Sequence, residues 1–408
     1  MFRVFGCVAA LVCLAAGSAG GDEVRLRVWL DTPGGDLPFE LSVVDDRAVI
    51  RNGVERIEID GVRWSDDSDG FVVPFEHYDS ELMLRRSGEG MYSGTFIKMR
   101  GGDNTARVVA HARQIGSLGS PEARFDPIPE SAGEGGFAGR WRVAFESSED
   151  PAVGVFEVDD DGGARGTFLT TTGDYRHLAG RVDGQMLRLS TFDGAHAFLF
   201  RATMRDDGGL SGDFWSGNWW HETWSAERDD DAALPDGFGV SVWNADAAAG
   251  LRFPDTAGIE RAVDDPALRG EVTILDVFGT WCPNCADATD LLVEYERVYG
   301  ARGLRVIGLA FELTDDFERS VRQVERHQRR HGAAWPVLIV GAADKKLAGR
   351  AFPALDRVRS YPTLIFLDRE GRVRGVHTGF SGPATGGAHR AMRDRFESLI
   401  DELLGEAD

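Results

Sequence analysis

The chain has 408 residues and a formal net charge of −22, with 42% of its residues hydrophobic and 27% charged. This length suffices for two or three globular domains, each with its own core, and the composition is not that of a disordered chain. So acidic a balance argues against nucleic acid or an anionic membrane surface as the partner.

The N-terminus is predicted to be a secretory signal peptide covering residues 1–20. Arg3 precedes the apolar stretch Val8 to Ala16, and a run of small residues follows at 17–20. This order is typical of a cleaved export signal, and the stretch is too short for a permanent membrane span. We therefore expect an exported protein of the periplasm or cell envelope, without a transmembrane segment in the mature chain. Lipidation at Cys13 is the less favoured alternative, because no small residue directly precedes this cysteine.

The region from Val24 to about Arg228 is predicted to be all-β. Short runs of β-branched and aromatic residues are punctuated there by Asp-Gly turn signals. The pattern from Leu82 to Phe96 is echoed from Phe198 to Phe214. We therefore expect an all-β unit at 22–115 and a second at 137–230, each a hairpin meander folded as a sandwich or barrel. The second unit is a candidate repeat of the first.

Strands alternate with helices in the C-terminal part, which we assign to residues 238–408 after an acidic, proline-containing linker. This order predicts an α/β domain with a central mixed sheet. The expected strands are Val272 to Phe278, Leu304 to Leu309, Val337 to Val340, Thr363 to Leu367 and Arg372 to Thr378, and the expected helices follow Cys282, run from about Asp316 to His331, and close the chain.

Two cysteines stand at the predicted junction of a buried strand and a helix. Removal of the signal peptide removes Cys7 and Cys13 and leaves only Cys282 and Cys285. A cysteine at a helix N-terminus is favoured as a thiolate, so Cys282 is the expected nucleophile. Cys285, one turn inside the helix, would resolve the mixed disulfide and close a Cys282–Cys285 bond.

Two other uses of the cysteine pair are weaker. A structural zinc ion needs four ligands, and this pair supplies only two. A structural disulfide closing so short a loop would stabilise the fold little. His327 and His331 lie four apart on the predicted helix, but Arg326, Arg329 and Arg330 surround them and disfavour a cation. We therefore predict no metal site and expect these histidines in solvent.

Two segments carry a resemblance to a known family. Asp276-Val277-Phe278-Gly279-Thr280-Trp281-Cys282-Pro283-Asn284-Cys285, followed by Tyr361-Pro362-Thr363 ahead of an apolar strand, resembles the thioredoxin fold, and within it the TlpA-like thiol-disulfide oxidoreductases. The resemblance covers residues of about 251–404 and leaves the N-terminal region unrecognised. It implies a thioredoxin-like domain with a strand-helix insertion between the cysteines and Pro362.

The resemblance also implies roles for single residues. Pro362 would follow a cis peptide bond and set the backbone of Tyr361 against Cys282, where Tyr361 and Trp281 would contact a substrate. Asp276 would be a buried acid that moves the proton of the resolving thiol. The family often carries a glutamate at the position of Ala288, and Asp287 or Glu312 are candidate substitutes.

Together these features predict an exported thiol-disulfide oxidoreductase that reduces disulfide-bearing proteins. The redox step needs no cofactor, and the resemblance implies a membrane thiol carrier as electron donor. One rival is a thiol peroxidase of the peroxiredoxin type, although Thr280 stands two residues before Cys282 instead of three. Another is an envelope binding protein whose β region carries the main role. The tryptophans between Trp215 and Trp224 would suit binding, but tryptophan in an all-β domain is more often core.

Overall fold

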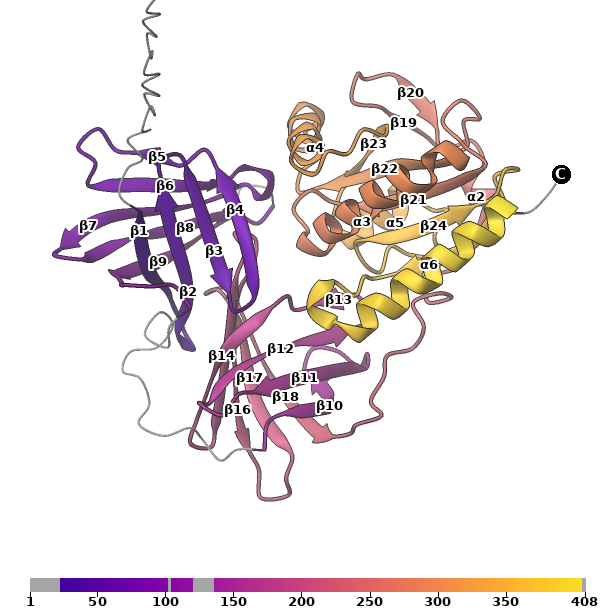
Figure 1. Ribbon diagram of the computed structural model, residues 1–408. Helices are drawn as coiled ribbons and strands as arrows, with labels where there is room; N and C mark the ends of the chain where they lie inside the picture. The colour runs from indigo at the N-terminus through magenta and orange to yellow at the C-terminus, as the bar shows by residue number, and fades with distance from the viewer. Residues whose placement is uncertain (1–22, 102–103, 120–135, 406–408) are drawn as a thin grey trace, which may run out of the picture.

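The computed structural model describes residues 23–101, 104–119 and 136–405. The predicted signal peptide lies outside these residues. Figure 1 shows three lobes: the N-terminal strands in indigo and violet, a second set of strands in magenta, and an α/β lobe in orange and yellow. The cysteine pair belongs to the α/β lobe, and both β lobes contact it.

The N-terminal lobe is a nine-stranded antiparallel sheet in the order β4-β3-β2-β1-β9-β8-β7-β6-β5. Alternate side chains of its strands enter one apolar core, where Leu26, Phe39 and Phe96 have no exposed surface. The strands are β1 (Val24–Thr32), β2 (Gly35–Val44), β3 (Arg47–Asn52), β4 (Glu55–Asp60), β5 (Arg63–Trp64), β6 (Gly70–Phe75), β7 (Ser80–Gly88), β8 (Met91–Met99) and β9 (Thr105–Gln114), with a 3-10 turn η1 (Glu76–Tyr78) before β7.

The second lobe is a closed barrel of eight strands, β10, β11, β12, β14, β15, β16, β17 and β18, because β11 pairs with both β10 and β12. Aromatic side chains fill its interior, including Trp141, Phe168, Phe200 and Trp224. The strands are β10 (Gly139–Phe145), β11 (Ala152–Val158), β12 (Gly163–Thr170), β13 (Gly173–Asp174), β14 (Leu178–Asp183), β15 (Met186–Phe192), β16 (Ala197–Met204), β17 (Leu210–Ser216) and β18 (Trp220–Arg228). The short β13 pairs with the end of β12 outside the barrel wall.

The two β lobes share a cyclic strand order. The last strand pairs with the first in each, β9 with β1 and β18 with β10, and the preceding strands form a meander. Gly94 and Gly212 belong to the echoed sequence pattern. They lie in β8 and β17, each the next-to-last strand of its lobe in chain order. The prediction of an all-β region that includes a barrel is therefore confirmed. Trp224 lies in the barrel core and Trp215 packs against the core of the N-terminal sheet, whereas Trp220 of the same hairpin is 48% exposed.

The two β lobes are joined through Phe192, at the end of β15. Its ring stacks on Phe39 at 4.3 Å and meets the edges of Phe75 and Phe96 inside the core of the N-terminal sheet. Its backbone N–H and C=O both bond to the side chain of Asn52. A barrel residue thus completes the core of the other lobe, and the two lobes pack as one body.

The α/β lobe has a five-stranded sheet in the order β23-β22-β21-β24-β25. Strands β21, β22 and β23 are parallel to one another, β24 is antiparallel to β21, and β25 is antiparallel to β24. This is the predicted mixed sheet, and β22, α4, β23 and α5 lie between the helix of the cysteines and Pro362. Helix α5 is an addition that the sequence patterns did not predict. The elements are α2 (Ala245–Ala248), β19 (Arg252–Pro254), β20 (Glu260–Ala262), β21 (Val272–Phe278), α3 (Pro283–Tyr299), η2 (Gly300–Arg302), β22 (Leu304–Glu312), α4 (Phe317–His331), β23 (Val337–Ala342), α5 (Lys345–Ala351), β24 (Thr363–Leu367), β25 (Val373–Thr378), η3 (Pro383–Thr385) and α6 (Gly387–Gly405).

Helix α4 docks on the N-terminal sheet. Arg319 forms an ion pair with Asp79, and Nε2 of Gln323 donates to the carbonyl oxygen of Glu76 over 3.1 Å.

The expectation that His327 and His331 face solvent is wrong, because His327 is only 2% exposed and the side chain of His331 8%. His327 is enclosed by its own lobe, because its Nε2 lies 2.9 Å from the hydroxyl of Thr289 and its ring packs on Phe278, and His331 pairs with Asp290 of α3. Sequence alone could not show that α3 packs against this face of α4.

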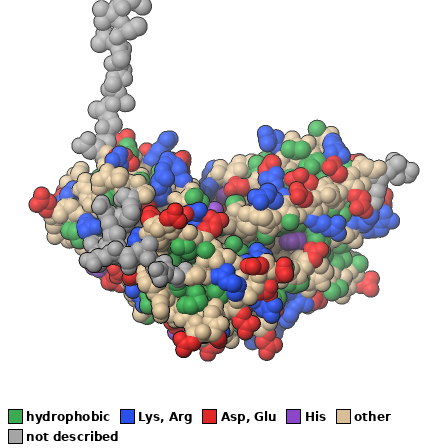
Figure 2. Space-filling view, turned by 60° about the horizontal axis from the view of Figure 1, so that its bottom comes forward, with side chains coloured by type: hydrophobic (Ala, Val, Ile, Leu, Met, Phe, Trp, Pro, Cys, Tyr) green, Lys and Arg blue, Asp and Glu red, His purple; other side chains and the backbone are tan. Residues whose placement is uncertain are grey.

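No helix among the described residues is both long and apolar enough to cross a membrane. Figure 2 shows acidic and basic side chains interspersed over the face that it draws. On this face the negative charge is therefore spread out and does not form one acidic patch.

Candidate redox site

The cysteine pair lies where β21 gives way to α3. Cys282 is the N-cap of α3, Pro283 is its first residue, and the backbone N–H of Cys285 donates to Sγ of Cys282 over 3.2 Å. Proline suits the first turn of a helix because its missing N–H would have no helical partner there. Both cysteines are free thiols, with Cys282 7% exposed and Cys285 fully buried. The N–H donation and the helix N-terminus favour negative charge on Sγ of Cys282, as predicted for a nucleophile.

A proline loop lies against the first cysteine. The peptide bond between Tyr361 and Pro362 is cis, which confirms the expectation for Pro362. The thiol of Cys282 donates to the carbonyl oxygen of Tyr361 over 3.4 Å, so residues 79 positions apart meet at the sulfur. The ring of Trp281 packs edge-on against Tyr361 at 5.5 Å, and its Nε1 donates to the carbonyl oxygen of Phe311. This arrangement fixes the aromatic wall beside the thiol.

Asp276 lies in the middle of β21 and is 1% exposed, as expected for the buried acid that the resemblance implies. Burial raises the pKa of this carboxyl to about 8, and among the described residues no hydrogen-bond partner meets its Oδ1. Burial, Cys282 and the charge of Asp276 together raise the pKa of the Cys285 thiol well above its usual value. Asp276 and Cys285 are thus electrostatically coupled, and the carboxyl can hold or release a proton near neutral pH.

The two candidate substitutes for the family's glutamate have other partners. Glu312, 1% exposed, accepts from the backbone N–H of Thr280 over 3.1 Å and from its hydroxyl over 2.8 Å. Burial raises the pKa of Glu312 to about 7, although the bonds to Thr280 oppose this. Glu312 therefore braces the loop that leads to the cysteines. Asp287 forms an ion pair with Arg176 of the barrel.

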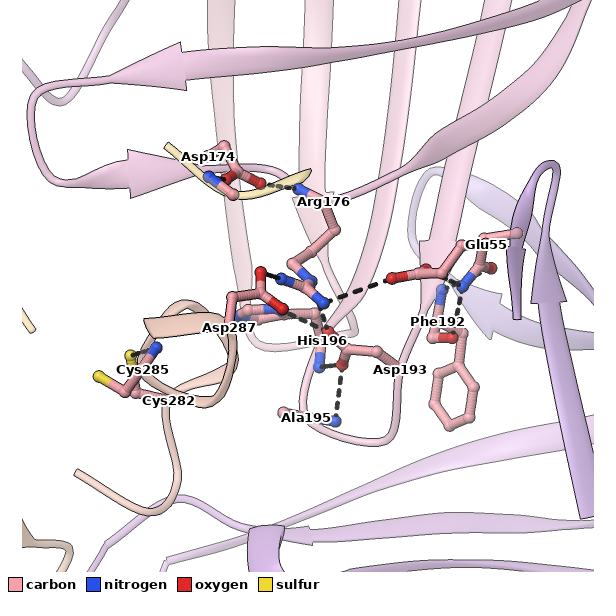
Figure 3. A network of polar contacts seen from close by, with 12 residues as sticks. Glu55, Asp174, Arg176, Phe192, Asp193, Ala195, His196, Cys282, Cys285 and Asp287 are labelled. Atoms are coloured by element: carbon pink, nitrogen blue, oxygen red, sulfur yellow. Dashed lines mark hydrogen bonds and ion pairs between the residues drawn. The ribbon is translucent and has the colours of Figure 1, made fainter. Parts of the chain in front are cut away.

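The barrel reaches the cysteine site through residues that sequence reasoning missed. Arg176, whose side chain is only 11% exposed, is held by Asp287 of α3, Glu55 of the N-terminal sheet and Asp193 of the barrel, and Figure 3 shows these carboxylates around its guanidinium. Burial opposes the charge, but Asp287 and the other carboxylates hold the pKa of Arg176 well above its usual value. No sequence signal marks this arginine, because its partners come from three distant segments.

A cavity of about 370 Å³ lies beside this ion-pair cluster. Its lining comes from all three lobes and includes Glu55, Arg176, Asp287 and Arg330. Within the described residues no group of three or more His, Cys, Asp or Glu side chains has the geometry to hold a metal ion.

Comparisons with known proteins give only distant likenesses. No protein-family model matches the chain, and no curated protein matches it. A solved structure described as a putative thiol:disulfide interchange protein DsbE from Chlorobium tepidum is 20% identical, with a TM-score of 0.29, over 38% of this chain and 92% of its own. A secreted Mycobacterium tuberculosis disulfide oxidoreductase is 15% identical, with a TM-score of 0.28, over 39% of this chain and 100% of its own. A putative protein disulfide isomerase from Bacteroides thetaiotaomicron is 18% identical, with a TM-score of 0.28, over 38% and 86%.

These identities and TM-scores are too low to carry a functional argument, so the geometry of the site must do so. The sheet order, the cysteine pair at the start of α3 and the cis-proline opposite it define a thioredoxin-like domain. Most of the chain, including its β lobes, lies outside these likenesses.

Proposed function

We propose that this protein is an exported thiol-disulfide oxidoreductase that reduces disulfides of other proteins through Cys282 and Cys285. The observation that carries the proposal is the meeting of two backbone groups at one sulfur. Sγ of Cys282 contacts the N–H of Cys285 and the carbonyl of Tyr361, beside the cis bond of Pro362. Thiolate stabilisation and a neighbouring second thiol are the two requirements of disulfide exchange.

The cycle follows from these positions. The thiolate of Cys282 attacks one sulfur of a substrate disulfide, forms a mixed disulfide and expels the other substrate sulfur as a thiolate. Cys285 then loses its proton to Asp276 and attacks Sγ of Cys282, which releases the second substrate thiolate and closes the Cys282–Cys285 disulfide. The substrate gains two electrons and the protein loses two, so an external dithiol must reduce the protein again. A membrane thiol carrier is the donor that the resemblance implies.

Reduction of insulin disulfides by the dithiol form tests this proposal. The wild-type protein with dithiothreitol should accelerate insulin precipitation, whereas Cys282→Ser should give only the rate of dithiothreitol alone. Cys285→Ser should accumulate a mixed disulfide with substrate, because the resolving thiol is gone. Equal insulin reduction by wild type and Cys282→Ser would overturn the proposal. The measured potential of the pair would set the direction of electron flow.

The two rivals find less support. A peroxiredoxin-type peroxidase uses a threonine hydroxyl beside the reactive sulfur, but the hydroxyl of Thr280 donates to Glu312. A β region that holds a small ligand in its barrel would need internal space, and aromatic side chains such as Phe168 and Phe200 fill that interior. Hydrogen peroxide turnover without insulin reduction would favour the peroxidase.

A further inference from the structure

One segment of the barrel lies across the surface that surrounds the cysteines. It runs from Thr171 to Arg176, at the turn between β12 and β13 and just after it, and we call it the cover segment. Figure 3 shows Asp174 and Arg176 close to Asp287, with the two cysteines across the start of α3 from them. A segment of the β region therefore meets the helix that carries the cysteines.

The cover segment touches the loops on several sides of Cys282. The hydroxyl of Ser360, just ahead of Tyr361, donates to the carbonyl oxygen of Thr172 over 2.6 Å. In the loop after β25, the backbone N–H of Gly382 donates to Oδ2 of Asp174 over 2.6 Å. The cover segment thus spans from the cis-proline loop to the loop after β25.

Two glycines allow the backbones to approach this closely. A Cβ atom at Gly379 would lie 2.6 Å from the carbonyl oxygen of Thr171, and Gly379 also has a φ of +81°. A Cβ atom at Gly173 would overlap the side-chain amide of Asn284, the residue between the cysteines. The fit leaves no space for another chain between the cover segment and these loops.

An ion-pair cluster anchors the end of the cover segment. Arg176 has a left-handed φ of +64°, and Oδ1 of Asp174 accepts from its backbone N–H over 2.7 Å. Its guanidinium pairs with Asp287, only two residues beyond Cys285, and also with Glu55 and Asp193. Because Arg176 keeps two carboxylates within the β lobes, the pair with Asp287 can break without leaving the arginine uncompensated.

We propose that the cover segment determines which disulfides reach Cys282. It admits small disulfides and excludes protein segments until it is displaced. The inference rests on the proposed function for its meaning in catalysis. An extended substrate would have to lie beside Tyr361, where Thr172 now accepts the bond from Ser360. A small reagent needs only the exposed part of Cys282. The selected substrates would then be the proteins that can displace the cover segment from the surface beside Tyr361.

Size-dependent alkylation of Cys282 tests the cover without requiring catalysis. The parent protein is the full chain with Cys7→Ser, Cys13→Ser and Cys285→Ser, so that Cys282 is the single thiol. The measurement is the ratio of its alkylation rates with a maleimide on a long polyethylene glycol chain and with N-ethylmaleimide. The same ratio in urea, where no cover exists, gives the reference.

Two variants loosen the cover at different points. Asp287→Ala removes the ion pair with Arg176, and Ser360→Ala removes the bond to Thr172. Glu294→Ala is the matched control, because Glu294 lies on the same helix and pairs with Arg393 inside the α/β lobe. Urea midpoints show that each variant is folded.

If the cover exists, the rate with the long maleimide relative to the rate with N-ethylmaleimide should be well below its value in urea for the folded parent. Asp287→Ala should raise it severalfold, since the docked cover segment loses an ion pair to α3 while Glu55 and Asp193 still compensate Arg176. Ser360→Ala should raise it by a smaller factor, and Glu294→Ala should leave it unchanged. A parent ratio equal to that in urea, or no rise in either loosened variant, would overturn the cover. A protein that gives the predicted ratios, but whose Asp287→Ala variant with both cysteines intact still does not reduce insulin, would instead refute the proposed function alone.

Discussion

Replacing Asp276 by asparagine tests whether this buried carboxyl holds a proton for the cysteine pair, and whether its ionisation lowers the free energy of unfolding. Burial raises its pKa to about 8, whereas an aspartate in an unfolded chain titrates near about 3.9. The folded protein therefore binds this proton more tightly than the unfolded chain does. The contribution of Asp276 to stability is most favourable below about pH 4 and falls as the pH rises towards about 8.

The magnitude follows from the same two values. Each pH unit between them costs about 1.4 kcal/mol, so the change from about pH 5 to about pH 8 costs the wild type on the order of 4 kcal/mol at this residue. The amide of the Asp276→Asn variant would not titrate. Between these pH values the free energy of unfolding should therefore fall by about 4 kcal/mol less in the variant than in the wild type. The variant should be the more stable protein at pH 8.

Urea unfolding at the two pH values measures the difference, with both proteins in the dithiol form. Asp264→Asn, at an exposed position of the same lobe, controls for the loss of one negative charge. Parallel pH dependences of wild type and Asp276→Asn would refute the raised pKa and with it the proton-holding role. If the role is correct, Asp276→Asn also slows release of substrate from the mixed disulfide, whereas the initial attack by Cys282 is little affected.

Two further predictions concern the contacts between lobes. Phe192→Ala should lower the free energy of unfolding by about 3 to 5 kcal/mol in urea titrations, because a fully buried ring leaves a cavity in the core of the N-terminal sheet; a loss below about 1 kcal/mol would contradict the shared core. Arg319→Ala should cost about 1 to 3 kcal/mol, because it leaves the partly buried Asp79 without its ion-pair partner. Adding Asp79→Asn to Arg319→Ala should restore part of that loss, and purely additive losses in this double-mutant cycle would show that the two side chains do not interact.

Local patterns were sufficient for the five central strands and the three long helices of the α/β lobe, although they did not predict α5. The apolar runs at 272–278 and 363–367 became β21 and β24 with the predicted bounds, and the amphipathic pattern gave α4. The cysteine pair and Pro362 were recognisable because their chemistry depends on short spacing or on one residue type. In the β region, turn signals indicated hairpins but not which strands close a barrel, because closure pairs strands through non-local contacts.

The sequence by itself determined the position of the dithiol, because both cysteines fall within one strand-helix junction, and it predicted Asp276 as the buried acid of that strand. Only the tertiary structure decided what surrounds that dithiol. Arg176, Asp174 and Ser360 come together from the barrel and the α/β lobe, and their hydrogen bonds and ion pairs have no trace in the order of residues. Side chains far apart in sequence carry no local signal of their pairing, so the cover over Cys282 could be found only once the lobes were packed.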